Sequence, residues 1–136
     1  MSQEFINNTI KVFFTVQLNI KLFHWNTSSY AQHIATDKFS GKLLELTDKF
    51  VEVFIGKYSY KPNLNNFSGS KKGGGIDTTK ITFYNNDIDT IKTLLNDFSN
   101  ILNNIENNNI NDKSLLTIRD ELLGEINQTL YLLQLK

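Results

Sequence analysis

The sequence predicts an all-α protein in which one domain, residues 1–136, forms a four-helix bundle. Three observations lead to this fold class. Four separate stretches repeat apolar residues at steps of three and four, the period of an amphipathic helix. Two of the intervening turns are short, and a long stretch with the only proline separates the second helix from the third. A chain of 136 residues also has the usual size of one domain with its own core.

The first helix is expected over about residues 3–26. Projected at about 100° per residue, its apolar residues form one stripe, and His24 falls in line with that stripe. His24 is therefore expected to point inward, whereas Lys11, Thr15 and Asn19 lie on the far side. The stripe consists of Ile6, Ile10, Phe13, Val16, Ile20 and Phe23.

The second helix is expected over about residues 29–57. The run Asn26-Thr27-Ser28-Ser29 before it breaks the apolar pattern and offers side chains that cap a helix N-terminus. Because this turn is short, the first two helices must pack antiparallel.

Residues 58–86 are predicted to form a long crossover, because Pro62 and the run SGSKKGGG at 68–75 are incompatible with a regular helix. Residues 71–75 (KKGGG) lack the order of a phosphate-binding loop and are interpreted as a mobile basic loop. A short piece around residues 80–84 is expected to cover one end of the bundle.

The third and fourth helices are expected over about residues 87–107 and 112–135, joined by a short asparagine-rich turn. Their candidate N-caps are Asn86 or Asp87 and Asn111 or Asp112. Apolar stripes run down both helices: Ile88, Ile91, Leu95, Phe98, Leu102 and Ile105 in the third, and Leu115, Ile118, Leu122, Ile126, Leu130 and Leu133 in the fourth. Two helix pairs joined by one long crossover form the ferritin-like version of the four-helix bundle.

The composition restricts the classes of function. Acidic and basic residues balance at 14 each, so no charge surplus favours nucleic acid or an anionic membrane, and DNA binding is expected to be weak at most. The chain has no cysteine, which excludes thiolate metal sites and cysteine nucleophiles. Residues 1–11 lack the pattern of a signal peptide, and no apolar run reaches bilayer length. We therefore expect a cytoplasmic protein that does not enter membranes.

The second helix has three faces rather than two when it is projected at about 100° per residue. The first packs into the core and consists of Ala35, Phe39, Leu43, Leu46, Phe50, Val53 and Phe54. The second is solvated and carries Lys38, Lys42, Glu45 and Lys49. The third, which we call the acid–histidine face, holds His33, Asp37, Asp48 and Glu52 among Gly41, Leu44, Val51 and Ile55.

The acid–histidine face predicts a covered surface that holds a cation. It has no lysine or arginine, and a buried carboxylate is costly unless it is paired or neutralised. With His24, the set comprises two imidazoles and three carboxylates, which suits iron(II), manganese or zinc better than copper(I). Because the core stripe of this helix is already accounted for, we expect another copy of the helix to cover the face. This predicts a homo-oligomer built on a twofold dimer that shares its metal sites.

The same residues resemble the motif of a known family. The pattern Leu18-x-x-Lys21-x-x-His24-Trp25-Asn26, followed by His33-x3-Asp37-x10-Asp48-x3-Glu52, is similar to that of the Dps proteins, the mini-ferritins. The resemblance implies iron as the metal and a ferroxidase site formed by His24, His33, Asp37, Asp48 and Glu52. It implies that the histidines and the Asp48/Glu52 pair come from different subunits, and that Trp25 shields the site and supplies an electron. It also implies a twelve-subunit shell that stores iron and protects against peroxide.

The turn between the two histidines departs from the family pattern. The interval from His24 to His33 is shorter than usual, and residues 26–30 replace the family's Gly-Pro-aromatic turn. An alternative hypothesis is therefore a ferritin-like structural or interaction protein without turnover. In that case His24 is a core residue, Trp25 is a packing residue and the acids are solvated. DNA compaction would rest on Lys71 and Lys72 alone.

Overall fold

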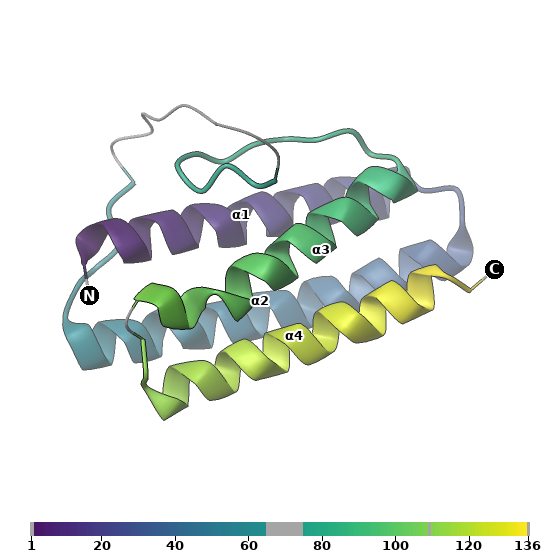
Figure 1. The fold of residues 1–136 in the computed structure, drawn as a ribbon. Coiled ribbons are helices and arrows are strands. Elements are labelled where there is room, and N and C mark those ends of the chain that lie inside the picture. The colour runs from purple at the N-terminus through teal and green to yellow at the C-terminus, as the bar shows by residue number, and fades with distance from the viewer. Residues whose placement is uncertain (1, 65–74, 109, 136) are drawn as a thin grey trace.

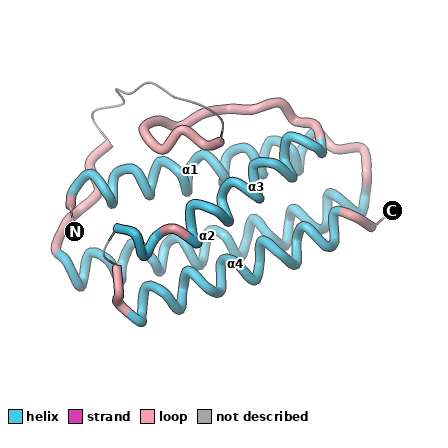
Figure 2. Tube along the Cα trace, in the orientation of Figure 1, coloured by secondary structure: helices cyan, strands magenta, loops and turns pink. Residues whose placement is uncertain are grey.

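The computed structural model describes residues 2–64, 75–108 and 110–135, with only the backbone of Asn108. All regular secondary structure in these residues is helical (Figures 1 and 2). The elements are α1 (Gln3–Asn26), α2 (Tyr30–Tyr58), α3 (Ile88–Asn103), the short 3-10 helix η1 (Ile105–Asn108) and α4 (Lys113–Leu133). The predicted all-α four-helix bundle is confirmed.

The helices form two antiparallel pairs, α1 with α2 and α3 with α4. In Figure 1, α1 and α4 run from left to right, whereas α2 and α3 run from right to left. α2 packs against α1 on one side and against α4 on the other, and α3 packs against both α1 and α4. α2 and α3 are therefore parallel, and the chain between them must travel back along the bundle, as the sequence predicts.

The core is made by the predicted stripes. The stripe of α1 is buried throughout, from Ile6 to Phe23. In the other helices, every predicted stripe residue is buried except Val53, Ile88 and Leu130, which are partly buried and pack against the core. Aromatic rings join the helices at its centre, where Phe13 makes edge-on contacts with Phe50 at 5.6 Å and Phe98 at 6.2 Å between ring centroids. The helical period alone thus identified the inward faces.

The helix starts are set by capping side chains that the sequence had suggested. Ser29 accepts a hydrogen bond from the backbone N–H of Gln32 at the start of α2 (3.2 Å). Asp87 caps α3, and Asp112 caps α4 by accepting from two backbone N–H groups. Hydrogen bonds to charged Asp favour its ionised form, so the pKa values of Asp87 and Asp112 lie below the ordinary value.

The third helix ends earlier than predicted. It stops at Asn103, and a 3-10 turn replaces the last part of the expected helix at 87–107. Buried Arg119 of α4 donates from Nη1 to the Leu102 carbonyl (3.1 Å) and from Nη2 to Glu106 (2.8 Å). Asparagine is a weak helix former, so this run ends the helix readily, and Arg119 satisfies one of its last carbonyls.

The far side of α1 is buried, which corrects the prediction for Lys11, Thr15 and Asn19. All three are almost fully covered, because the end of the crossover runs along α1. Asn19 donates to the Thr82 carbonyl (2.7 Å) and accepts from the Tyr84 N–H (2.8 Å). The segment expected to cover one end of the bundle thus lies along its flank (Figure 1).

Thr15 and Lys11 continue these contacts along the helix. The Thr15 hydroxyl oxygen accepts from the Thr82 N–H (3.3 Å), and Lys11 Nζ donates to the Thr79 carbonyl (3.2 Å). Polar side chains of α1 therefore supply the hydrogen-bond partners that the buried backbone of the crossover needs.

Two further predictions concern the crossover and membranes. The basic glycine-rich run lies outside the described residues, apart from Gly75, whose φ of 88° is in the left-handed region that glycine favours. No helix in the described part of the chain combines the length and apolarity that a bilayer crossing requires.

Candidate metal-binding site

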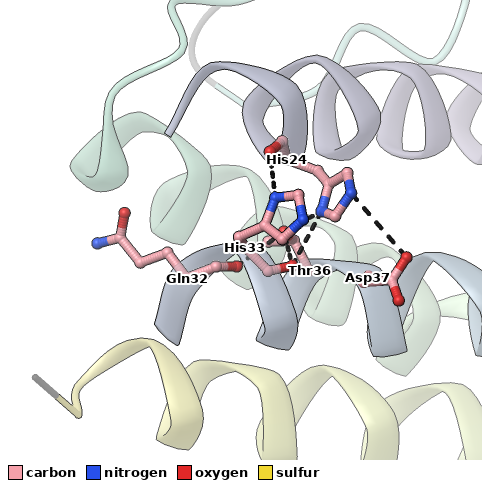
Figure 3. Close-up of polar contacts among 5 residues, drawn as sticks. All are labelled: His24, Gln32, His33, Thr36 and Asp37. Atoms are coloured by element: carbon pink, nitrogen blue, oxygen red, sulfur yellow. Dashed lines mark hydrogen bonds and ion pairs between the residues drawn. The ribbon is translucent and has the colours of Figure 1, made fainter. Parts of the chain in front are cut away.

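The short turn between α1 and α2 brings the two histidines into direct contact. His24 lies in the last turn of α1 and His33 in the first turn of α2 (Figure 3). Their rings stack with centroids 3.9 Å apart and planes 18° from parallel. The change in this turn relative to the mini-ferritin pattern therefore does not separate the histidines.

Each histidine is held by the backbone carbonyl of the other. His24 Nδ1 lies 2.9 Å from the His33 carbonyl oxygen, and His33 Nδ1 lies 3.0 Å from that of His24. A carbonyl only accepts hydrogen bonds, so both Nδ1 atoms carry the proton and donate. In the neutral ring, Nε2 is then the unprotonated nitrogen with a free lone pair. Metal-binding histidines are typically oriented in this way, by an N–H donated to a carbonyl.

Thr36 adds a second acceptor for His24. Its hydroxyl oxygen lies 3.2 Å from His24 Nδ1, and the hydroxyl donates to the carbonyl of Gln32 at 2.8 Å (Figure 3). Since the single hydroxyl proton is used toward Gln32, the oxygen accepts from His24. Thr36 is fully buried, so this contact fixes both the tautomer and the rotation of the ring.

Asp37 lies on the open side of the histidine pair. Its Oδ1 is 3.9 Å from His24 Nε2, and its side chain is 66% exposed whereas that of His24 is 8% exposed. Unprotonated Nε2 and a carboxylate are both acceptors, so a proton or a cation between them would stabilise the arrangement. Two ligands of one tetrahedral cation, each about 2.1 Å from it, lie about 3.4 Å apart, so a small movement of the exposed Asp37 side chain would allow both groups to bind one metal.

Asp48 and Glu52 form a second, separate cluster on α2. Both are exposed, and a hydrogen bond to Asp48, together with its negative charge, raises the pKa of Glu52 above the ordinary value. Asp48 lies eleven residues beyond Asp37, or about 16 Å along the helix, so it cannot reach the histidine pair within one chain. In the described residues, no three His, Asp or Glu side chains come close enough to hold a metal ion.

Trp25 does not pack over the histidines within the chain. It is 67% exposed, and its ring lies 5.8 Å from Lys21 Nζ in a cation–π contact. The prediction that Trp25 packs is therefore wrong for the single subunit, because Trp25 follows His24 directly and is turned about 100° around the helix from the buried stripe to which His24 belongs.

The sequence interpretation missed an apolar surface beside these residues. An open groove of about 550 Å³ lies between α1 and α2 and is lined by Phe14, Gln17, Leu44, Asp48 and Val51 among others. Phe14, Leu18 and Leu44 are exposed at its surface or close by. The signal was a second stripe on α1, in which Phe14, Leu18 and Trp25 share one sector of the helix.

Comparison with known proteins gives a family but no function. No curated protein and no solved structure is significantly similar to the chain. The sequence model of one family matches residues 24–133, which include both histidines, the acid–histidine face and three of the four helices in full. Because the match covers most of the chain, the protein belongs to this family, which is described as a family of unknown function (DUF5856).

Proposed function

We propose that the protein oxidises and stores iron in the manner of a mini-ferritin, at a metal site completed by a second copy of the chain. The observation that carries the proposal is the pair of histidines whose Nδ1 atoms donate to carbonyls. This arrangement leaves both Nε2 lone pairs available for a metal, with Asp37 on the open side.

Each chain supplies two halves of a site rather than one whole site. One half is the histidine pair with Asp37, and the other is the Asp48/Glu52 pair. The acids lie on an exposed face among apolar side chains, beside the open groove. A twofold dimer would bring the halves together twice, because the same surface of each copy contacts the other.

Iron(II) is the substrate of the proposed reaction. Two iron(II) ions give one electron each to hydrogen peroxide, which takes up two protons and becomes two water molecules, leaving two iron(III) ions. Dioxygen is the alternative oxidant, with four iron(II) ions and four protons yielding two waters. Carboxylates offset the metal charge and favour iron(III), and imidazoles fix the ligand geometry. Two helix pairs joined by one long crossover support the proposal, because ferritin-like bundles have one such connection.

The test compares iron(II) oxidation by peroxide in the unmodified protein and in two single variants, His33→Ala and Asp48→Ala. Each variant is expected to lose the protein-dependent rate, whereas Glu121→Ala, at an exposed position of α4, is expected to keep it. Mixing the two inactive variants should restore about a quarter of the activity, since half of the dimers would have one intact site of two. The proposal fails if both variants oxidise iron as fast as the unmodified protein.

A second candidate function is a structural or interaction protein of the same fold. It is favoured by the reciprocal hydrogen bonds of His24 and His33, which tie α1 to α2 without any metal. In that case, calorimetric titration of the unmodified protein with iron(II) would give no binding heat, while His33→Ala would still lower the melting temperature.

A further inference from the structure

We infer that α2 of one subunit pairs antiparallel with α2 of a second copy in a single register, in which Leu44 packs over Gly41 of the partner subunit. The inference rests on the proposed shared metal site and specifies the partner and the contact that complete it. It follows from the spacing of the acid–histidine face, from its charges and from the space above Gly41.

The spacing of the ligand residues is symmetric about one point of α2. An antiparallel register that places His33 opposite Glu52 of the partner subunit also places Asp37 opposite Asp48 of the partner subunit. Both pairs have their midpoint between residues 42 and 43. A twofold axis at this point therefore completes two equivalent sites at once, because each residue of an isologous contact appears on both sides of the axis.

The charges favour the antiparallel direction. The first half of the face carries His33 and Asp37 beside His24, and the second half carries Asp48 and Glu52. The antiparallel register places His33 opposite Glu52 of the partner subunit, and its one kind of like-charge contact, Asp37 with Asp48 of the partner subunit, is where the proposed metal would bind. A parallel pair with equal residues opposite each other would instead place all three acids opposite the same acids. Like charges at a contact disfavour the wrong partner arrangement, and complementary charges set the register.

A close approach of the second copy would explain why residue 41, in the interior of a helix, is glycine. A Cβ at Gly41 would meet no atom within 4 Å, so nothing inside the subunit requires glycine there. Glycine destabilises a helix interior relative to alanine. Gly41 lies next to the symmetry point, where the same register sets it opposite Leu44 of the partner subunit. Leu44 is 54% exposed in the single chain, so the contact would bury an apolar side chain in the space that glycine leaves open.

Cysteine crosslinking tests the register directly, because the chain has no cysteine of its own. Asp37→Cys and Asp48→Cys proteins are mixed without metal and oxidised, and disulfide-linked dimers are measured on a non-reducing gel. The mixture is expected to crosslink, whereas each variant alone is not. In the antiparallel register, identical positions lie eleven residues apart, or about 16 Å, well beyond the Cα separation of about 7 Å that a disulfide allows.

Lys38→Cys mixed with Lys49→Cys, both on the solvated face, is the matched control and should not crosslink. All four positions are exposed, so unchanged helical circular dichroism is expected for every variant. Crosslinking of Asp37→Cys or Asp48→Cys alone, at the level of the mixture, would indicate another arrangement and overturn the register. Absence of crosslinks in all samples would overturn it as well.

Substitution of the glycine tests the central contact. Gly41→Leu should raise the dimer dissociation constant at least tenfold in analytical ultracentrifugation. Gly124→Leu is the matched control, because Gly124 is also exposed and helical, and a Cβ there would likewise meet no atom within 4 Å, but it lies on α4. An unchanged dissociation constant for Gly41→Leu would contradict the contact. Crosslinking without metal and iron oxidation are separate measurements, so either the register or the proposed reaction can fail alone.

Discussion

The two flanks of α1 are built in opposite ways. On one flank Thr15 and Asn19 are fully buried and paired with the backbone of the crossover. On the other, Phe14 and Leu18 are exposed beside the groove between α1 and α2. The chain thus buries a polar side and leaves an apolar side open, the reverse of what hydrophobicity alone predicts for a single subunit.

The two flanks differ in where their side chains find partners. The polar flank is complete within the chain, because its amide and hydroxyl groups supply hydrogen bonds that buried crossover backbone needs. The apolar flank has no such internal partner in the described residues, and it adjoins the acids that we assign to a shared site. Substitutions on the two flanks should therefore act on different properties, one on folding and the other on association.

The largest effect is expected from Asn19→Leu on the polar flank. It leaves the Thr82 carbonyl and the Tyr84 N–H without their partner in a buried position. The free energy of unfolding should fall by about 3 kcal/mol, measured by urea denaturation at low protein concentration. Leu18→Asn, the exchange on the neighbouring flank, should change it by about 0.5 kcal/mol or less. Equal losses of unfolding free energy in the two variants would contradict the distinction between the flanks.

Phe14→Ser combined with Leu18→Ser should act on association instead. Both side chains are exposed in the single chain, so the monomer should retain its helix content. Self-association should weaken at least tenfold, because the apolar surface removed is buried only in the oligomer. Sedimentation over a range of concentrations measures this. A variant that unfolds but still associates would show that the groove belongs to the core.

Thr36→Val tests the turn between α1 and α2, where a hydrogen bond within the chain orients a histidine of the proposed metal site. It removes one of the two acceptors at His24 Nδ1 while keeping the shape of the side chain. Metal affinity should fall by about tenfold, since groups that orient ligand histidines contribute about this much. Thr36→Ser should restore it. Imidazole nitrogen chemical shifts of the metal-free protein should show a larger fraction of the Nε2-protonated tautomer for Thr36→Val.

The smallest effect is expected from Glu52→Gln. Hydrogen bonding to Asp48 and its negative charge raise the pKa of Glu52 in the folded chain. The stability that protonated Glu52 contributes is present at low pH and is lost as pH rises through this pKa. Glu52→Gln should remove this slight dependence in melting temperatures recorded against pH, under conditions where the protein is monomeric. The reverse slope would contradict a repulsive acid pair.

Particular residues show how much of the structure could be predicted from the sequence. Helical period alone identified the inward faces. Capping chemistry narrowed the starts of α2, α3 and α4 to a few candidates, among which the structure uses Ser29, Asp87 and Asp112. The position of His24 also followed from its place in the stripe, and the structure buries it. Asn19 could not be placed correctly, because a polar residue on the outer side of a helix is normally solvated unless a distant segment covers it.

The sequence by itself determined the four amphipathic helices, their order, and the sharing of one face by His33 and the acids, because these depend on short-range periodicity. Only the tertiary structure decided that the rings of His24 and His33 stack, which nitrogen each one leaves free, and that the crossover covers Lys11, Thr15 and Asn19. These features depend on how residues distant in sequence meet, and the angle of a short turn and the path of a crossover are set by the packing of the whole bundle.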